Sequence, residues 1–230
     1  MTVESLLDLI PIDFGGGCGL SKAKLMYYLI EKYNIKESVD IGVYRGRSLV
    51  PQALAHKNHS KGIVFGVDPY NNKLISVNSD KELKKKINKF RKENNFDKVY
   101  REVKNLLKTT SLDSSVKFIR QTSNEAVKYF EKKSIHPRLI HIDGDHDTKV
   151  VVDDVLKYTQ ILGPNGFIVM DDISWGSVKP AVDIISNAPN FKLLFCKVST
   201  QNDYAVFTNI KSTRKNKNLV SNLYQFGQYE

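Results

Sequence analysis

Four aspartates near the middle of the chain have the type and spacing of ligands for a divalent cation. Asp143 and Asp145 directly follow one apolar run, and Asp171 and Asp172 end a second one. Carboxylates gathered in one place repel one another unless a positive charge neutralises them. A hard divalent cation such as Mg²⁺ prefers such oxygen ligands. The four side chains therefore predict a metal site, provided that the fold brings the two runs together.

The segment between the two runs indicates how they meet. Residues 139–142 and 167–170 have the composition of buried strands, and apolar residues recur with a helical period over 150–162. The sequence GPNG at 163–166 is turn chemistry that ends this helix. A strand–helix–strand unit is a parallel crossover, and its strands end at one edge of the sheet, where ligands bind. We therefore expect the four aspartates at one rim.

The remaining strands and helices extend this unit into a larger sheet. Strand-like runs are found at 37–41, 63–67, 116–120, 192–198 and 204–208. Helical patterns separate most of them, and a polar turn separates the last two, which indicates an antiparallel pair. The sequence thus predicts an α/β fold with a Rossmann-like, seven-stranded, mostly parallel sheet, helices on both faces and an antiparallel final strand.

The tips of the first three strands have the residues of a nucleoside site. Gly42 and Gly46 mark a tight strand-to-helix turn, where the backbone approaches a ligand. Asp68 ends the second strand, 22 positions beyond Gly46, where an acid accepts both ribose hydroxyls. Polar residues 122–124 follow the third strand, either as base contacts or as a helix N-cap. The G-x-x-x-G spacing differs from the dinucleotide fingerprint, so an NAD-dependent dehydrogenase is disfavoured.

Two basic features near this edge have two interpretations each. Arg45 and Arg47 lie beside the glycine turn, where they meet a carboxylate or a substrate anion, or else form part of the charged surface. Residues 71–115 form a basic helical insertion, with helical patterns at 81–94 and 100–107. The insertion is either a lid that closes over a ligand or a third helical layer, and we expect it to combine the two.

Length and composition are those of one soluble domain. The chain has 230 residues, 41% of them hydrophobic, and a formal net charge of +10. The basic segments lack the interleaved aromatics of single-strand binders, so we favour a lysine-rich surface over a nucleic-acid or membrane partner. Two cysteines, no signal peptide and no long apolar run indicate a reduced, cytoplasmic protein. We expect one domain over 1–230, whose polar tail, 211–230, is either loose or a docking arm for a homo-oligomer.

Two motifs carry a resemblance to a known family. IDGDH at 142–146 is followed by MDD at 170–172, behind the glycine turn and Asp68. Over roughly residues 39–172 the chain resembles the class I S-adenosylmethionine-dependent methyltransferases. Within these it is similar to the metal-dependent macrocin O-methyltransferase family, which includes the mycinamicin and novobiocin sugar O-methyltransferases.

The resemblance implies a role for each matching position. It implies cofactor binding by a set of residues at the strand tips: Asp40, Gly42, Gly46, Ser48, Asp68, Ser123 and Asp143. Many relatives carry an acid at the position of Ser123. The Mg²⁺ ligands would be Asp143, Asp171 and Asp172. Asp145 would be the base that deprotonates the acceptor hydroxyl, with His146 assisting.

The function implied is transfer of a methyl group from S-adenosylmethionine to a hydroxyl of a sugar, in a small molecule, glycan or nucleotide sugar. A catechol-type or phenol O-methyltransferase is an alternative, because the 28-residue spacing from Asp143 to Asp171 also resembles that class. A nucleic-acid-binding protein on a methyltransferase fold is the alternative from another class. The other histidines have no ligand-like spacing, and we expect them to be structural or exposed: His56, His59, His136 and His141.

Overall fold

The computed structural model confirms the predicted architecture. It describes residues 1–13, 17–75, 81–198, 203–211, 222–223 and 225–226, with side chains omitted for 81–83. Seven strands form one sheet in the order β3-β2-β1-β4-β5-β7-β6. The strands are β1 Glu37–Ile41, β2 Ile63–Val67, β3 Val116–Ile119, β4 Leu139–Ile142, β5 Phe167–Asp171, β6 Lys192–Lys197 and β7 Tyr204–Thr208.

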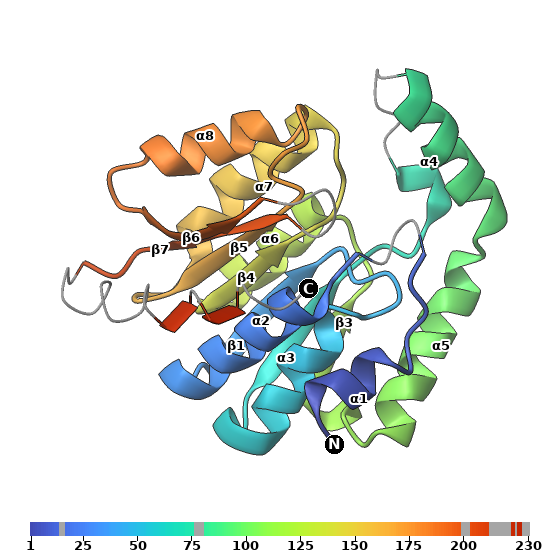
Figure 1. The fold of residues 1–230 in the computed structure, drawn as a ribbon, viewed down its shortest axis with the longest axis horizontal. Helices are drawn as coiled ribbons and strands as arrows, with labels where there is room; N and C mark the ends of the chain where they lie inside the picture. Colours follow the sequence, from blue (N-terminus) through green and yellow to red (C-terminus); the bar gives the residue numbers. More distant parts are fainter. Residues whose placement is uncertain (14–16, 76–80, 199–202, 212–221, 224, 227–230) are drawn as a thin grey trace.

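The pairing of the strands brings five carboxyl ends to one edge. Strands β1 to β5 pair with one another in parallel, and β7 runs antiparallel between β5 and β6. The register sets Ile41 opposite Val67 on one side and Ile142 on the other, so three strands end at the same level. As predicted, the residues that follow these strands meet at one rim of the sheet (Figure 1).

Helices cover both faces of the sheet. They are α1 Val3–Leu7, α2 Leu20–Tyr33, α3 Leu49–Ala55, α4 Lys81–Glu93, α5 Phe96–Thr109, α6 Ser123–Lys133, α7 Thr148–Ile161 and α8 Lys179–Asn187. A π-helical turn, His56–Ser60, extends α3, and short 3-10 turns lie at Asn72–Leu74 and Asp113–Ser115. Figure 1 shows α6, α7 and α8 on one face, and α1, α2, α3 and α5 on the other.

Each face has its own apolar core. One core joins α1, α2, α3 and α5 to the sheet, and the other joins α6, α7 and α8 to it. Leu25, Met26 and Leu29 of α2 have no exposed surface, so this helix is anchored along its inner side. Burial of several such side chains, at roughly 1.5–3 kcal/mol each, fixes the helix that begins beside the carboxyl edge.

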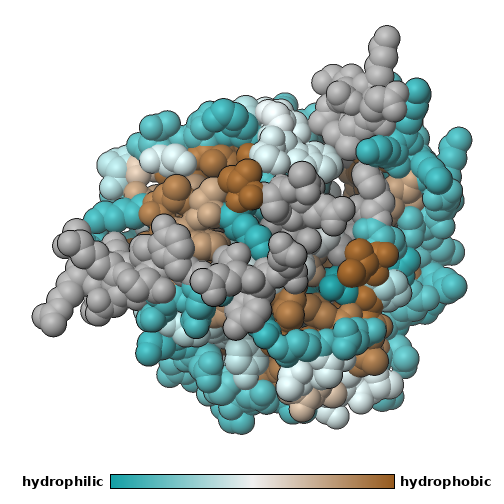
Figure 2. Space-filling view, in the orientation of Figure 1, coloured by the Kyte–Doolittle hydropathy of each residue, from teal (hydrophilic) through white to brown (hydrophobic). Residues whose placement is uncertain are grey.

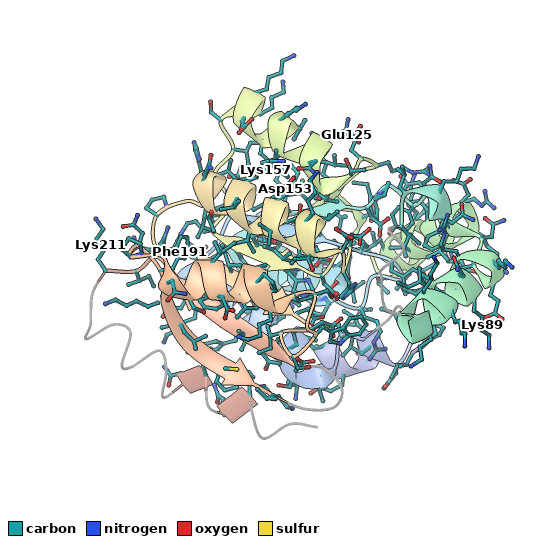
Figure 3. All side chains as sticks on the ribbon, turned by 90° about the horizontal axis from the view of Figure 1, so that it is seen from above. Lys89, Glu125, Asp153, Lys157, Phe191 and Lys211 are labelled. Carbon is teal, nitrogen blue, oxygen red and sulfur yellow. The ribbon has the colours of Figure 1, made fainter. Side chains whose placement is uncertain are left out.

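The basic insertion forms part of a helical layer, which is one of the two arrangements that we expected, and its role as a lid stays a prediction. Helix α5 buries Phe96, Val99, Val103 and Leu107 against the core and is thus part of a helical layer. Helix α4 continues from it and extends past the sheet edge (Figure 1). Ile87 of α4 is buried, whereas Lys89 is exposed at the periphery of the molecule (Figure 3). The lysines of α4 that the structure describes are exposed, as the surface interpretation predicts.

The surface is mostly polar. Figure 2 shows hydrophobic side chains gathered over the end of the sheet that carries β6 and β7. Leu193 in β6 and Val198 after it are among the exposed apolar residues there. Within the described part of the chain, none of the helices combines the length and the hydropathy that a bilayer crossing needs.

Asp154 makes the stability of this fold depend on pH. It is buried on the inner side of α7, and burial raises its pKa to about 7. Because the folded protein favours the protonated acid, we expect its contribution to the free energy of unfolding to fall as pH rises from about 4 to 7. Asp154→Asn should remove this fall, by up to a few kcal/mol at about 1.4 kcal/mol per pKa unit.

Denaturant unfolding at pH 5 and pH 8 tests this prediction. The control is Asp153→Asn, because Asp153 faces outward on the same helix and pairs with Lys157 at 3.3 Å (Figure 3). Wild type and the control should lose stability between the two pH values by more than Asp154→Asn does. Equal losses in all three proteins would contradict the assignment.

Candidate active site

A cavity of about 810 Å³ opens at the carboxyl edge of the sheet, where the first five strands end. Eight of the eleven residues predicted for the site border it: Gly42, Asp68, Ser123, Asp143, Asp145, His146, Asp171 and Asp172. The other three, Asp40, Gly46 and Ser48, do not border the cavity that the described residues enclose. The edge of the sheet therefore collects the predicted side chains from five separate strand tips.

The turn after β1 requires glycine at its start. Gly42 has a φ of +84°, and a Cβ built on it would lie 1.8 Å from the backbone oxygen of Asp143. The backbone of the first strand tip thus touches the backbone of the fourth. Gly46 also has a positive φ, +87°, and begins the turn into α3. The close approach at Gly42 ties the glycine turn to the carboxylate end of the cavity.

Asp68 is held rigidly at the tip of β2. Its two carboxylate oxygens accept backbone N–H bonds from Tyr44, at 2.9 Å, and from Tyr70, at 2.7 Å. Burial raises its pKa from the ordinary value, and these two N–H groups oppose the rise. The backbone N–H of Val43 also lowers this pKa, and a carboxylate with about four acceptor positions has capacity left for a hydroxyl group in the cavity.

Asp40 is a buried structural acid rather than part of the cavity wall. Its carboxylate accepts a hydrogen bond from Ser48 Oγ at 2.8 Å and contacts His141 Nδ1 at 2.7 Å. Asp40 and His141 have no exposed surface. This chain of contacts joins the glycine turn to β4, so Asp40 and Ser48 lie behind the site; their predicted contact with a cofactor stays a prediction.

The residues that follow β3 form the capped start of helix α6. Thr122 and Glu125 form a capping box at the beginning of α6, as the N-cap interpretation predicts. Ser123 borders the cavity, and its backbone oxygen accepts a hydrogen bond from Tyr158 at 3.0 Å. The main chain near Ser123 is thus anchored to α7, and this wall of the cavity is fixed.

The fourth strand tip arranges its polar side chains through a tight loop. Asp145 Oδ1 accepts the backbone N–H of Asp147 at 2.8 Å, and Asp147 in turn caps α7. His146 Nε2 lies 2.6 Å from Asp172 Oδ2, and its ring packs at 4.6 Å from the ring of Trp175. Burial lowers the pKa of His146, but the carboxylate of Asp172 outweighs this and raises it.

The fifth strand tip contains a buried ion pair that the sequence analysis missed. Lys22 of α2 donates its ammonium to Asp171 Oδ2, and Lys22 has no exposed surface. Burial alone would raise the pKa of Asp171, but the ammonium of Lys22 overcomes that effect and lowers it to about 2. The signal was present in the sequence, because Lys22 precedes Leu25 and Met26 at helical spacing and so lies on their apolar side.

Asp143 lies between the ion pair and the outer carboxylates. Burial raises its pKa well above the ordinary value, and the charge of Asp171 adds to this effect. A bound cation would relieve the electrostatic repulsion between the carboxylates of Asp143 and Asp171.

Two groups of side chains have the spacing to hold a cation. Asp143, His146 and Asp172 form one group, and His141, Asp143 and Asp171 form the other. Within each group the ligand atoms lie within 4.8 Å of one another. Carboxylate oxygens suit Mg²⁺ or Mn²⁺, and an imidazole nitrogen suits transition metals. The donor set therefore fits a divalent cation. His141 was expected to be structural or exposed; it is buried, and it belongs to one of these groups.

The insertion and the N-terminal segment form the far wall of the cavity. Ile87 and Phe90 of α4 border the cavity, and the ring of Phe90 packs at 5.2 Å from that of Tyr44. Arg45 pairs with Asp13 at 2.7 Å, and Arg47 is buried and donates to the backbone of the first twenty residues. Neither arginine is part of a free basic surface, because each binds groups of the protein itself.

Comparisons with known proteins bear on the family and the fold of this chain. A family model described as a methyltransferase domain matches residues 39–173. None of the curated proteins matches the chain. Among solved structures, the O-methyltransferase from Bacillus cereus in complex with SAH is 13% identical, with a TM-score of 0.64 over 90% of this chain and 89% of that one.

Two further solved structures share the fold. The O-methyltransferase TomG from Streptomyces achromogenes, which is involved in tomaymycin synthesis and was solved with SAM, is 10% identical, with a TM-score of 0.62 over 91% of this chain and 95% of that one. A Staphylococcus aureus protein named for caffeoyl-CoA O-methylation is 15% identical, with a TM-score of 0.58 over 90% of this chain and 92% of that one.

The close approach at Gly42 generates a prediction. Gly42→Ala places a methyl group against the backbone of Asp143 at a positive φ. We expect it to lower the free energy of unfolding by about 2–5 kcal/mol, because strain in the left-handed region and overpacking add. Gly176→Ala is the matched control, because nothing lies within 4 Å of a Cβ at that position. Chemical denaturation measures both variants, and equal stabilities would contradict the prediction.

Proposed function

The chain belongs to the family of methyltransferase domains, and from this premise we propose that it is an S-adenosylmethionine-dependent O-methyltransferase that requires a divalent cation, Mg²⁺ or a similar ion. The observation that carries the proposal is the meeting of Asp68 with the carboxylates of Asp143 and Asp172 in one cavity. A nucleoside position and a cation position that share one cavity suit a reaction between a cofactor and an oxygen nucleophile.

The cofactor half of the proposal rests on the turn after β1 and on Asp68. The positive φ of Gly42 lets the turn approach a ligand without a side chain in the way. Asp68 retains acceptor positions for ribose hydroxyls, and Ser123 borders the wall at the next strand tip. The ligands SAH and SAM of the Bacillus and Streptomyces proteins support the same cofactor here.

The catalytic half rests on the tips of β4 and β5. When bound, S-adenosylmethionine supplies an electrophilic methyl group, and a divalent cation lowers the pKa of a hydroxyl beside it. The predicted ligands Asp143, Asp171 and Asp172 all border the cavity. Asp145, fixed by the N–H of Asp147, would accept the proton of the acceptor hydroxyl. The oxygen would then be free to take the methyl group as the bond from the methyl carbon to the cofactor sulfur breaks, with S-adenosylhomocysteine as the leaving group.

A sugar hydroxyl is the acceptor that we propose. The support is the IDGDH motif, which places Asp145 two positions after the first carboxylate of the cation site. These carboxylates and Trp175 border the same cavity, and the ring of Trp175 packs at 4.6 Å from that of His146. A small molecule or glycan with vicinal hydroxyls has the polar edge and apolar face that such a wall accommodates.

One observation favours a second acceptor class. The Staphylococcus aureus protein of the same fold is named for caffeoyl-CoA O-methylation, and caffeoyl groups are phenolic. The apolar wall of Ile87, Phe90 and Trp175 would also accommodate an aromatic ring. A screen of glycosides, nucleotide sugars and catechols in parallel separates the two classes.

Removal of the cation should separate cofactor binding from turnover. We expect calorimetry with S-adenosylhomocysteine to show binding with and without a chelator, because Asp68 and the glycine turn need no metal. Methyl transfer to the acceptor should fall to background in chelator and return when Mg²⁺ or Mn²⁺ is added. Full methyl transfer in metal-free buffer would contradict the requirement for a cation.

The base is tested by removing its charge. Asp145→Asn keeps the shape of the side chain and the contact with Asp147 but accepts no proton. We expect S-adenosylhomocysteine binding to be retained and kcat to fall by about 10²–10⁴-fold. Asp183→Asn is the control, because Asp183 is exposed on α8 and pairs only with Lys179 among the described residues. Wild-type turnover in Asp145→Asn would remove Asp145 from the role of base.

A further inference from the structure

The carboxyl edge contains two cation positions that share one ligand. All three residues of the outer group, Asp143, His146 and Asp172, border the cavity. In the inner group, His141, Asp143 and Asp171, the two aspartates border the cavity and His141 does not. Three aspartates and two imidazoles could therefore be divided between two cations, and the question is which group the divalent ion of the proposed function takes.

The inner position already has a cation that is part of the fold. The ammonium of Lys22 bonds to Asp171, and the side chains of the pair are 0% and 5% exposed. Helix α2 buries Leu25, Met26 and Leu29 on the same side as Lys22. The ammonium cannot leave for water unless this helix unpacks from the sheet, so Asp171 has a permanent counter-ion.

The outer position is open to ligands from the cavity. The side chains of His146 and Asp172 are each 25% exposed, and their facing atoms are 2.6 Å apart. Two ligand atoms at neighbouring positions around one octahedral ion lie about 3 Å apart, given metal–ligand distances of about 2.1 Å. A small rotation of either side chain therefore makes room for the ion between them.

A divalent ion on Asp171 would sit beside the ammonium of Lys22. Two cations at that separation repel each other strongly in a buried site, where the effective dielectric constant is low. Displacing Lys22 would leave a buried ammonium without its counter-ion, which is strongly destabilising. Asp143 belongs to both groups, so its carboxylate can face either the inner or the outer position.

We propose that Lys22 removes Asp171 from the ligand set, and that Asp143, His146 and Asp172 hold the divalent cation. The inference rests on the proposed function, which requires the cation, and it reassigns two residues within it. Asp171 becomes a positioning residue that fixes the tip of β5 through Lys22. His146 becomes a nitrogen ligand, which leaves Asp145 as the base.

His141 defines the competing arrangement. Its Nδ1 faces Asp40, and its buried Nε2 has no hydrogen-bond partner among the residues that the structure describes. A carboxylate that orients one nitrogen often leaves the other for a metal. If the divalent ion took the inner position and displaced Lys22, His141 would be its nitrogen ligand in place of His146.

Pulsed electron paramagnetic resonance of bound Mn²⁺ distinguishes the two arrangements. The sample is the full chain with Mn²⁺ and S-adenosylhomocysteine, and the readout is hyperfine coupling of Mn²⁺ to a directly bound ¹⁴N nucleus. We expect this coupling in the wild type and its loss in His146→Gln, with Mn²⁺ affinity reduced by about tenfold or more. Absence of the coupling in the wild type, or its survival in His146→Gln, would overturn the assignment.

The double variant Lys22→Met with Asp171→Asn tests whether Asp171 is a ligand of the cation. It removes both buried charges together, so that neither is left without a counter-ion. We expect the ¹⁴N coupling to persist and Mn²⁺ affinity to stay within about threefold of the wild type. A loss of more than about thirtyfold, typical of a removed ligand, would make Asp171 a ligand and overturn the proposal.

Two controls keep the outcomes distinct. Asp172→Asn retains both members of the inner ion pair and should weaken Mn²⁺ binding. It therefore tests the outer position even if the double variant does not fold. Unchanged Mn²⁺ binding in Asp172→Asn would overturn the proposal. Calorimetry with S-adenosylhomocysteine on the same samples tests the proposed function separately. If the cofactor binds but the ¹⁴N coupling does not come from His146, only this inference is overturned. If the cofactor does not bind, the proposed function is overturned.

Discussion

The structure depends on how negative charge is neutralised at the carboxyl edge of a parallel sheet. The topology brings Asp143, Asp171 and Asp172 to two adjacent strand tips, where their like charges would destabilise the fold. One of these charges is neutralised from within, by Lys22 on the helix that precedes β1. The remaining carboxylates face the cavity, where the proposed divalent cation would find its ligands.

The same edge explains why the cofactor and cation positions are coupled. Gly42 and Asp143 touch through their backbones, so the position of the glycine turn and that of Asp143 depend on each other. The contacts from Ser48 through Asp40 to His141 join the same two strands from behind. A scaffold that fixes both positions relative to each other supplies the orientation on which methyl transfer mainly depends.

Much of this arrangement could be predicted from the sequence, because its signals are local. Strand runs, turn glycines and acids at strand tips each act over a few residues, and they place Asp68 and Asp143 correctly at the edge. Lys22 was missed because its partner is 149 positions away, and only the packed helix brings the two together. The burial of Asp40 beside His141 depends on the neighbouring strand, which a local pattern does not contain.

The most direct test of the account is the distance between the cation and the transferred methyl group. Nuclear magnetic resonance of the full chain with S-adenosylmethionine labelled with ¹³C at the methyl group reports it, because bound Mn²⁺ broadens the resonances of nearby nuclei. The account predicts strong broadening of the methyl signal that disappears in Asp143→Asn. A sharp methyl signal in wild-type protein that binds both the cofactor and Mn²⁺ would place the cation elsewhere and contradict it.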